Sequence, residues 1–262
     1  MRALRIAATG MAAQQMNVEV ISNNIANMNT VGFKKQSAVF EDMLYQNIET
    51  PGAQSSNTGT VVPTGVQLGS GVKAGSVYRI TTQGSMTQTG NQFDLAINGK
   101  GYFQVLLPTG ETAYSRAGNL AVNDTGQLVT ADGYQVIPQI TIPQNATGVT
   151  ISQTGQVQVS IAGQTAPQLV GNMQLATFFN EAGLEAQGNN LYMESGASGA
   201  PVVGQPGQPG FGTLMQGYTE ASNVDPVSEI TNLIVAQRAY EMNSKVVSAA
   251  DSMLATAVQS KQ

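Results

Sequence analysis

SNVDPVSEITNLIVAQRAYEMNSKVVSAADSMLATAVQSKQ, residues Ser222–Gln262, is the stretch that decides the fold. An apolar residue returns in it every seven positions, at Leu233, Tyr240, Val247 and Leu254. Seven residues make close to two helical turns, so this spacing places one apolar stripe along an α-helix. We expect the helix to begin at Pro226, a favourable first helical residue, and to continue to about Gln259. At ~1.5 Å per residue it would be roughly 50 Å long, which suggests a rod element rather than a core helix.

The other end of the chain carries a second stripe of the same period. Its members are Leu4, Met11, Val18 and Ile25, with Ile21 and Met28 beside them. The two stripes together form a candidate assembly seam, and two interpretations stay open. They belong either to an antiparallel helix pair that closes one soluble domain, or to a subunit whose helices pack against those of other copies.

Several positions along the two stripes are weak, because Gly10, Gln15, Ser22 and Asn243 offer little apolar area. A lone pair of such helices would gain little from burial. We therefore predict that both termini are largely disordered in the isolated monomer and fold on assembly, when neighbouring copies supply the missing contacts.

The composition argues against catalysis and against metal binding. Charged residues make up only 10% of the 262 residues, and there is no His, Cys or Trp. The chain therefore lacks imidazole bases, thiolate nucleophiles and the usual zinc ligands. We expect no enzymatic activity, no catalytic residue, no cofactor and no metal.

Charge and hydropathy also limit the partners. The net charge is −5, and no basic stripe interleaved with aromatic residues is present, so we expect no nucleic-acid binding. The chain has no apolar run of 18 residues, and its first residues do not have the apolar core and cleavage site of a signal peptide. We expect no membrane insertion and no cleaved signal peptide.

Three stretches resemble the signatures of the bacterial flagellar rod and hook protein family. They are SNNIANMNTVGFKKQSAVF (Ser22–Phe40), TGNQFDLAINGKGYFQV (Thr89–Val105) and SNVDPVSEITNLIVAQRAYEMNSKVVSAADSML (Ser222–Leu254), in the family's order. The residues that carry the first and third signatures are Asn23, Asn24, Ala26, Asn27, Gly32, Phe33, Gln237, Arg238, Ala239 and Tyr240.

Within that family, Phe40–Val72 is similar to the extended segment of distal rod members, and the chain is shorter than hook subunits. The segment is rich in Gly, Pro and Ser, so composition alone would also fit a floppy surface loop. The resemblance implies a structural subunit of the distal rod that polymerises into a helical tube, transmits torque from motor to hook and carries the export channel. Two alternatives remain: a proximal rod or short hook-like subunit, and a secreted β-domain that binds or hydrolyses cell-wall glycan on a helical stalk.

Partners and location follow from the same resemblance. The implied partners are further copies of the chain, proximal rod and hook subunits, peptidoglycan and outer-membrane ring proteins, and the flagellar type III export apparatus. The implied location is the flagellar basal body, across the periplasm and the outer-membrane ring region.

The middle of the chain predicts a β-rich domain over Lys73–Phe179. Short strand-like runs alternate there with turn dipeptides at Asn98-Gly99, Thr109-Gly110, Thr125-Gly126 and Asp132-Gly133. We expect an α+β fold with terminal helices paired in a coiled-coil-like bundle and a nested antiparallel barrel or sandwich. The expected parts are a terminal helical core (1–32 and 222–262), a connector region (33–72 and 180–221) and the β domain (73–179).

Two candidate sites within this domain have simpler explanations. Asn98–Gly101 could be a phosphate loop, but it lacks the full glycine spacing, and we expect a tight hairpin turn. Asp124 and Asp132 could form a carboxylate pair for glycoside hydrolysis, but each precedes a turn glycine and is better explained as a turn cap.

One face of the C-terminal helix is polar but carries few charges. In the family the C-terminal helix is the more inward one, so this face is a candidate lining of the export lumen, although a merely solvated face explains it equally well. The candidate lumen residues are Asn232, Asn243, Ser244, Ser248 and Ser252.

Overall fold

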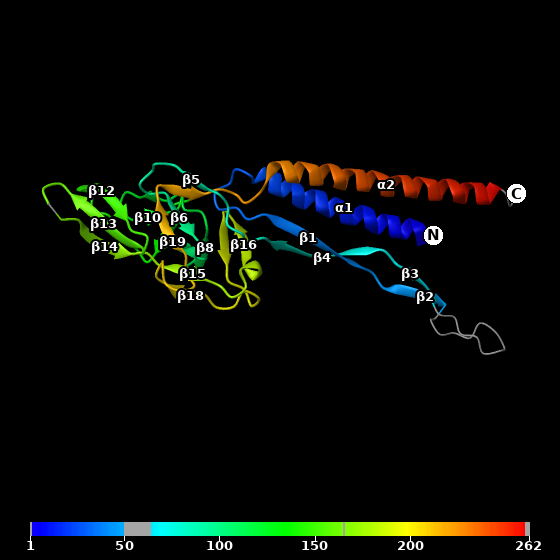
Figure 1. Cartoon of the computed structure of the whole chain (residues 1–262), viewed down its shortest axis with the longest axis horizontal. Coiled ribbons are helices and arrows are strands. Elements are labelled where there is room, and N and C mark those ends of the chain that lie inside the picture. The colour runs from blue at the N-terminus through cyan, green and yellow to red at the C-terminus, as the bar shows by residue number, and fades with distance from the viewer. Residues whose placement is uncertain (1, 50–63, 165, 260–262) are drawn as a thin grey trace. The chain divides into compact units, whose positions relative to one another are not determined.

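The computed structural model describes residues 2–49, 64–164 and 166–259, and the chain divides into two compact units (Figure 1). The first, called here the helical unit, comprises Met1–Ile25, Gln36–Tyr78 and Pro226–Gln262. The second, called the β unit, comprises Ala26–Lys35 and Arg79–Asp225. The predicted α+β fold, with a helix at each end and strands in the middle, is confirmed.

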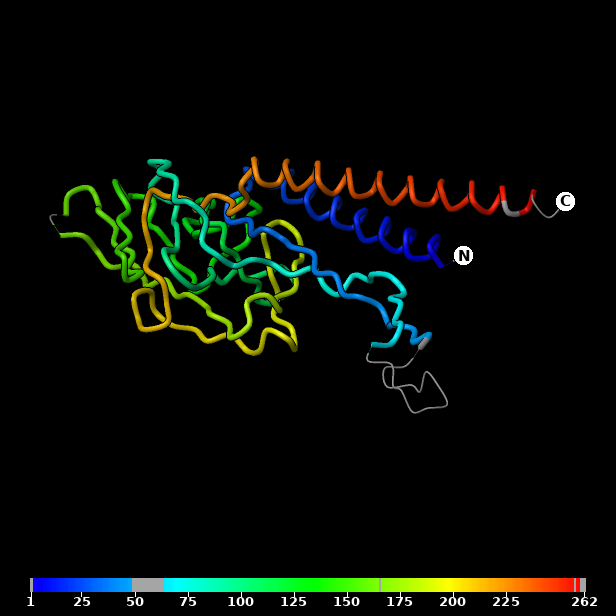
Figure 2. The backbone as a smooth tube through the Cα atoms, turned by 45° about the vertical axis from the view of Figure 1, so that its right-hand side comes forward, coloured from blue at the N-terminus to red at the C-terminus, as the bar shows by residue number. Residues whose placement is uncertain are grey.

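Two long helices form the main part of the helical unit: α1 (Arg2–Ala26) and α2 (Pro226–Gln259). The bounds predicted for α2 are confirmed, and α1 ends at Ala26. The helices run side by side in opposite directions in both views (Figures 1 and 2). Asn24 near the end of α1 meets Glu229 near the start of α2, and Gly10 lies against Asn243.

The rest of the helical unit is a pair of two-stranded ribbons. Strand β1 (Gln36–Asp42) pairs with β4 (Val72–Arg79), and β2 (Tyr45–Glu49) pairs with β3 (Val66–Gly69). The backbone N–H of Val72 in β4 donates a hydrogen bond to Thr9 Oγ1, 3.3 Å away. This bond connects the β1–β4 ribbon to α1. The two ends of the predicted extended segment Phe40–Val72 are therefore strands, while its residues 50–63 lie outside the described residues.

The β unit contains a nine-stranded sheet. Its main path runs β16 (Glu185–Gly188), β17 (Leu191–Met193), β8 (Thr112–Ser115), β7 (Tyr102–Leu106), β11 (Gln135–Ile137), β10 (Leu128–Val129) and β9 (Ala121–Val122). Strand β15 (Leu175–Thr177) pairs with β7 and with β18 (Val202–Gly204). Over the described residues this path is open, so of the two expected forms, barrel or sandwich, a closed barrel is not found.

Smaller sheets complete the β unit. They are β12 (Ala146–Ile151), β13 (Gln156–Ile161) and β14 (Gln168–Asn172), then β6 (Leu95–Asn98) with β19 (Thr213–Gln216), and β5 (Met86–Gln88) with β20 (Tyr218–Glu220). A short 3₁₀ turn, η1 (Glu181–Gly183), precedes β16. The main core collects apolar residues from both the nine-stranded and the three-stranded sheets, including Phe103, Leu128, Val157 and Val159.

The stretch 180–221, expected to be connector, contributes strands β16 to β20. They pair with strands from the expected β domain, as in β17 with β8 and β19 with β6. Leu191 and Leu214 are buried there. These strands are only three or four residues long and lie among Gly and Pro residues. The sequence therefore shows no alternating run from which they could be predicted.

Three of the four predicted turn glycines, Gly110, Gly126 and Gly133, lie in turns between antiparallel partners and have positive φ angles. Gly99 also has a positive φ, but the hairpin predicted there is wrong, because β6 and β7 belong to different sheets. None of the helices, over the part of the chain that the structure describes, is long and apolar enough to cross a membrane.

Candidate functional site

The contact between α1 and α2 is built mainly from small and polar side chains. On α1 the buried residues are Ala7, Ala13, Val20, Ile21 and Asn24. On α2 the buried residues are Glu229, Ala236 and Ala250, in successive steps of seven and fourteen. Small residues allow the two backbones to approach closely, but they bury little apolar area. The helical unit therefore has a thin core of its own.

The structure places the predicted seam residues around this thin core. Ile21 is buried, whereas Leu4, Met11, Val18, Ile25, Leu233 and Val247 are half-buried. Tyr240 and Leu254 are exposed, at 43% and 41% of their surface. Met28 lies beyond the end of α1 and is exposed, because the chain leaves the helix at Ala26 and turns. The larger apolar seam residues thus keep much of their surface in solvent.

A further set of apolar side chains on α2 has no cover in the single chain. Its exposed members are Val227, Ile230, Ile234, Val235, Met242, Val246, Met253 and Val258. Many large apolar side chains exposed along a single helix usually mark a contact surface for another molecule. The surface of α2 therefore has the character expected of an interface.

Asn24 connects three parts of the helical unit. Its Nδ2 donates to Glu229 Oε2 at 3.1 Å and to the backbone oxygen of Gln36 at 2.8 Å. Its Oδ1 accepts a hydrogen bond from the Gln36 N–H at 2.8 Å. Asn24 and Glu229 are each 1% exposed, so the Asn24 amide and the Glu229 carboxylate are both desolvated, and these hydrogen bonds satisfy the Asn24 amide. This residue of the N-terminal signature therefore joins α1, α2 and β1.

The polar candidates on α2 do not all share one face. Asn232, Ser244, Ser248 and Ser252 are exposed. Ser248 Oγ donates to the Ser244 carbonyl and Ser252 Oγ donates to the Ser248 carbonyl, at 3.2 and 2.9 Å. Asn243 instead lies against Gly10 of α1, where a Cβ on Gly10 would come within 2.9 Å of its Nδ2. In the single chain Asn243 therefore faces α1, apart from the exposed serines among the candidate lumen residues.

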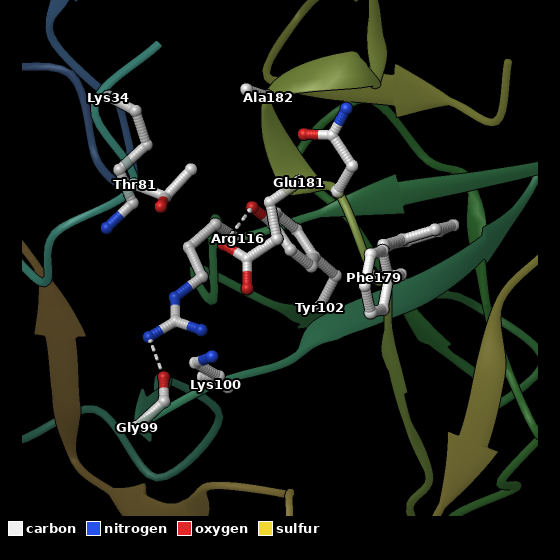
Figure 3. Close-up of a pocket in the computed structure, with 11 residues that line it drawn as sticks. Lys34, Thr81, Gly99, Lys100, Tyr102, Arg116, Phe179, Glu181 and Ala182 are labelled. Atoms are coloured by element: carbon white, nitrogen blue, oxygen red, sulfur yellow. Dashed lines mark hydrogen bonds between the residues drawn. The ribbon is translucent and has the colours of Figure 1, made fainter. Parts of the chain in front are cut away.

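The β unit contains a buried cluster of three charged side chains, Lys34, Arg116 and Glu220, here called the charge cluster. Lys34 Nζ lies 2.6 Å from Glu220 Oε1, and Arg116 Nε lies 2.5 Å from Glu220 Oε2. Arg116 also donates to the carbonyls of Ile97, Gly99 and Gly101, and Figure 3 shows its guanidinium pointing toward Gly99. Side-chain exposure is 5% or less for all three, so water screens these interactions little.

Burial and pairing act in opposite directions on the groups of the charge cluster. Burial alone would raise the pKa of Glu220, but the neighbouring Arg116 and Lys34 cations outweigh it and hold that pKa below its ordinary value. Burial also lowers the pKa of Lys34, and its hydrogen bond to Glu220 offsets this only in part. The Glu220 carboxylate thus offsets the desolvation cost of burying the Lys34 and Arg116 cations.

The loop Asn98–Gly101 binds Arg116 of the charge cluster rather than a phosphate. The loop presents carbonyl oxygens to the Arg116 guanidinium, whereas a phosphate loop presents N–H donors to an anion. A hollow of about 280 Å³ beside it is lined by Lys34, Lys100, Arg116 and Glu181 among others (Figure 3). The role of the loop is therefore to accept hydrogen bonds from Arg116.

The carboxylates Asp124 and Asp132 are not brought together as a pair. They lie in consecutive turns at opposite ends of β10, which joins β9 and β11. Asn123 Oδ1 and Thr130 Oγ1 accept the capping hydrogen bonds of these turns, so the turn-cap role predicted for the two aspartates falls to their neighbours.

The remaining signature residues have mixed positions. The Gly32 N–H donates to the Glu220 carbonyl at 2.8 Å, and Asn27 Oδ1 accepts from Thr30 Oγ1. Phe33 and Ala239 are half-buried, and Asn23, Ala26 and Gln237 are exposed. Arg238 pairs with Glu241 at 2.9 Å, as its spacing predicts. Sequence reasoning missed Lys34, Arg116, Glu220 and Glu229, and the only available signal was that charges are scarce in this chain.

A β unit inserted between two terminal helices, with apolar surface left open on the longer helix, defines a structural protein that is built to assemble. Family models match at three places. Residues 4–34 match the flagella basal body rod protein family, 96–159 the D1 domain of the flagellar hook protein FlgE/F/G family, and 215–260 the C-terminal region of flagellar basal body rod FlgEFG proteins.

Curated relatives cover nearly the whole chain. The flagellar basal-body rod protein FlgG of Caulobacter vibrioides is 69% identical over 97% of both chains, and FlgG of Bacillus subtilis is 40% identical over the full length of both. The rod protein FlgF of C. vibrioides is 36% identical over 88% of this chain and 85% of its own. This chain belongs to the flagellar basal-body rod protein family, and within it is more similar to FlgG than to FlgF of the same bacterium.

Proposed function

We propose that copies of this chain polymerise into a helical tube that transmits torque from the motor to the hook and carries the export channel. The chain is a structural subunit of the flagellar distal rod. The observation that supports polymerisation is the apolar surface of α2, which the single chain leaves exposed although α2 is part of a family signature. The family also favours this structural, non-enzymatic role over the glycan-binding and proximal rod alternatives.

The proposed partners are further copies of the chain, proximal rod and hook subunits, peptidoglycan and outer-membrane ring proteins, and the flagellar type III export apparatus. The proposed setting is the basal body, across the periplasm and the outer-membrane ring, after export without a cleaved signal peptide. The ribbons flanking residues 50–63 are proposed as the lateral contact of the distal-rod-type segment.

We also propose a specific fold for each of the two units. The residues of α2 that are buried or meet α1 alternate with the predicted seam residues at steps of three and four, which supports a coiled-coil-like bundle. The shared core of the nine-stranded and three-stranded sheets supports a sandwich-like β unit. The bundle would form the inner tube.

The proposal is tested by concentrating the purified full chain and examining it by electron microscopy and hydrogen exchange. We expect straight tubes above a threshold concentration. We further expect amides of α1 and α2 to exchange rapidly in dilute monomer and to become protected in tubes, because the thin helical core cannot by itself offset the ordering entropy. A chain that stays monomeric at all concentrations, with both helices protected, would contradict the proposal.

Asn24→Ala should weaken polymerisation. It removes the hydrogen bonds to Glu229 and Gln36 and leaves desolvated polar groups behind, at a cost of roughly 1–3 kcal/mol. The threshold concentration for tubes should then rise roughly 5-fold to 150-fold. Ser22→Ala, an exposed change on the same helix, is the matched control and should leave the threshold unchanged.

For the export lumen, the proposed lining is the exposed face of α2 that carries Ser244, Ser248 and Ser252, with the exposed Asn232 elsewhere on the same helix. The serine hydroxyl protons of Ser248 and Ser252 are donated to their own helix, so the face offers few free donors to a passing chain. Leucine at these serines should slow export through assembled rods, and unchanged export would remove the idea.

A further inference from the structure

The charges on α1 are few and are separated along the helix. Among the residues of α1, only Arg2, Arg5 and Glu19 are charged. The two arginines occupy the first turn, where no acidic residue accompanies them. Cations at this end oppose the helix dipole, which favours anions there. Neither arginine forms an ion pair with another described residue of the chain. The placement of Arg2 and Arg5 is unfavourable in the single chain, which indicates that their partner belongs to another molecule.

Arg2 and Arg5 share one face of α1 with Ile6, whose side chain is 42% exposed. These three residues, here called the basic tip, line one side of a hollow of about 120 Å³ against β3. Leu68 lies on the other side and is also exposed. The basic tip therefore offers two guanidinium groups next to an apolar side chain.

A groove of complementary chemistry lies farther along the same helix pair. It has a volume of about 550 Å³ and is lined by Gln15, Val18, Glu19, Gln237, Tyr240 and Glu241, here called the acidic groove. Glu19 comes from α1 and Glu241 from α2. Each is exposed and held by one neighbour, Glu19 by Gln15 Nε2 at 3.3 Å and Glu241 by Arg238 at 2.9 Å. Val18 and Tyr240 supply apolar surface between them.

We propose that the basic tip of one copy docks into the acidic groove of the next copy. Arg2 and Arg5 would meet Glu19 and Glu241, and Ile6 would cover Val18 and Tyr240. The inference rests on the proposed polymerisation and names the contact that directs it. The occupant is a second copy, because two cations and one apolar side chain on a helical face match two carboxylates and two apolar side chains across a groove.

The contact cannot close within one molecule. Arg5 and Glu19 are separated by about 21 Å along α1 at ~1.5 Å per residue, and the helix between them is continuous. The tip and the groove are different surfaces, so a docked pair keeps one free groove on the first copy and one free tip on the second. Such a heterologous contact adds subunits in one direction and gives the polymer its polarity.

The absence of cysteine from the chain allows a direct test by disulfide cross-linking in polymerised full-length protein. Ile6→Cys and Gln237→Cys in one chain place a thiol on the tip and one on the rim of the groove. Under mild oxidant we expect a ladder of covalent dimers, trimers and longer species after denaturation. The control chain pairs Ile6→Cys with Ser252→Cys, exposed on α2 and outside the groove, and should give no ladder.

Charge exchange supplies the second arm of the test. Arg2→Glu with Arg5→Glu, and separately Glu19→Lys with Glu241→Lys, should each raise the threshold concentration for tubes at least tenfold at low salt. The chain with all four substitutions should recover most of the loss, and Glu185→Lys, an exposed charge change on β16 of the β unit, should have little effect. Tubes that form normally from both reversed chains, a four-substitution chain that does not recover, or a missing ladder would overturn the docking. Unsubstituted protein that forms no tubes would remove the proposed function, and this contact with it.

Discussion

Glu220→Gln is expected to lower the free energy of unfolding of the β unit by about 3–5 kcal/mol at neutral pH, because it leaves two buried cations without their carboxylate. Glu220 is 1% exposed and lies within 2.6 Å of both Lys34 and Arg116. It also accepts a hydrogen bond from the Gly84 N–H at 2.9 Å. Urea unfolding of the full chain, followed by tyrosine fluorescence, measures the loss.

The matched control is Glu185→Gln, which neutralises an exposed carboxylate on β16 and should change the stability by less than about 0.5 kcal/mol. The pH dependence is a further check. The pKa of Glu220 is lowered in the folded state, so its contribution is present above the ordinary glutamate pKa of about 4.3 and is lost as pH falls through the lowered value. The difference between the native chain and the variant should therefore shrink in acid, and a difference that persists unchanged would contradict the assignment.

Gly32→Ala is expected to destabilise the β unit by roughly 2–4 kcal/mol, since a left-handed backbone and a steric overlap are combined at one position. Gly32 has a φ of +70°, and a Cβ there would come within 2.8 Å of the Ala117 nitrogen and of the Arg116 carbonyl carbon. Both are backbone atoms, which cannot turn aside as a flexible side chain would. Because the displaced segment carries Arg116, the charge cluster should also be disturbed.

The control for Gly32→Ala is Gly90→Ala. Gly90 has a similar φ of +73°, but a Cβ at that position meets nothing within 4 Å. The control reports the conformational strain alone, so the difference between the two variants reports the overlap with the Arg116–Ala117 backbone. If Gly32→Ala and Gly90→Ala lose equal stability in urea unfolding, the close approach of Gly32 to the Arg116–Ala117 backbone is not the reason why a glycine is needed there.

The sequence predicts best those elements whose pattern repeats. The bounds of α2 follow from an apolar residue at every seventh position and from Pro226. Three turn glycines are also placed correctly. The strands of 180–221 are too short for a period to show, and their partners are distant in sequence, as β17 and β8 are.

The candidate site is predictable to a smaller extent. Heptad spacing locates the helices and the apolar residues along them, but it does not show that alanines, Asn24 and Glu229 fill the contact while larger residues remain half-exposed. Lys34 and Glu220 are 186 residues apart, and Arg116 and Glu220 are 104 apart. Nothing local in a sequence indicates which two charges, so far apart, will be buried against each other.

The charge cluster lies where the chain leaves the β unit at both ends. Lys34 follows the end of α1 by eight residues, and Glu220 precedes the start of α2 by six. The segment that follows α1 and the segment that precedes α2 are therefore bonded to each other by an ion pair inside the β unit. Arg116 fastens this junction to three carbonyls of the β6–β7 loop. Separating these two segments from the β unit would therefore require two buried ion pairs and the hydrogen bonds of Arg116 to break together.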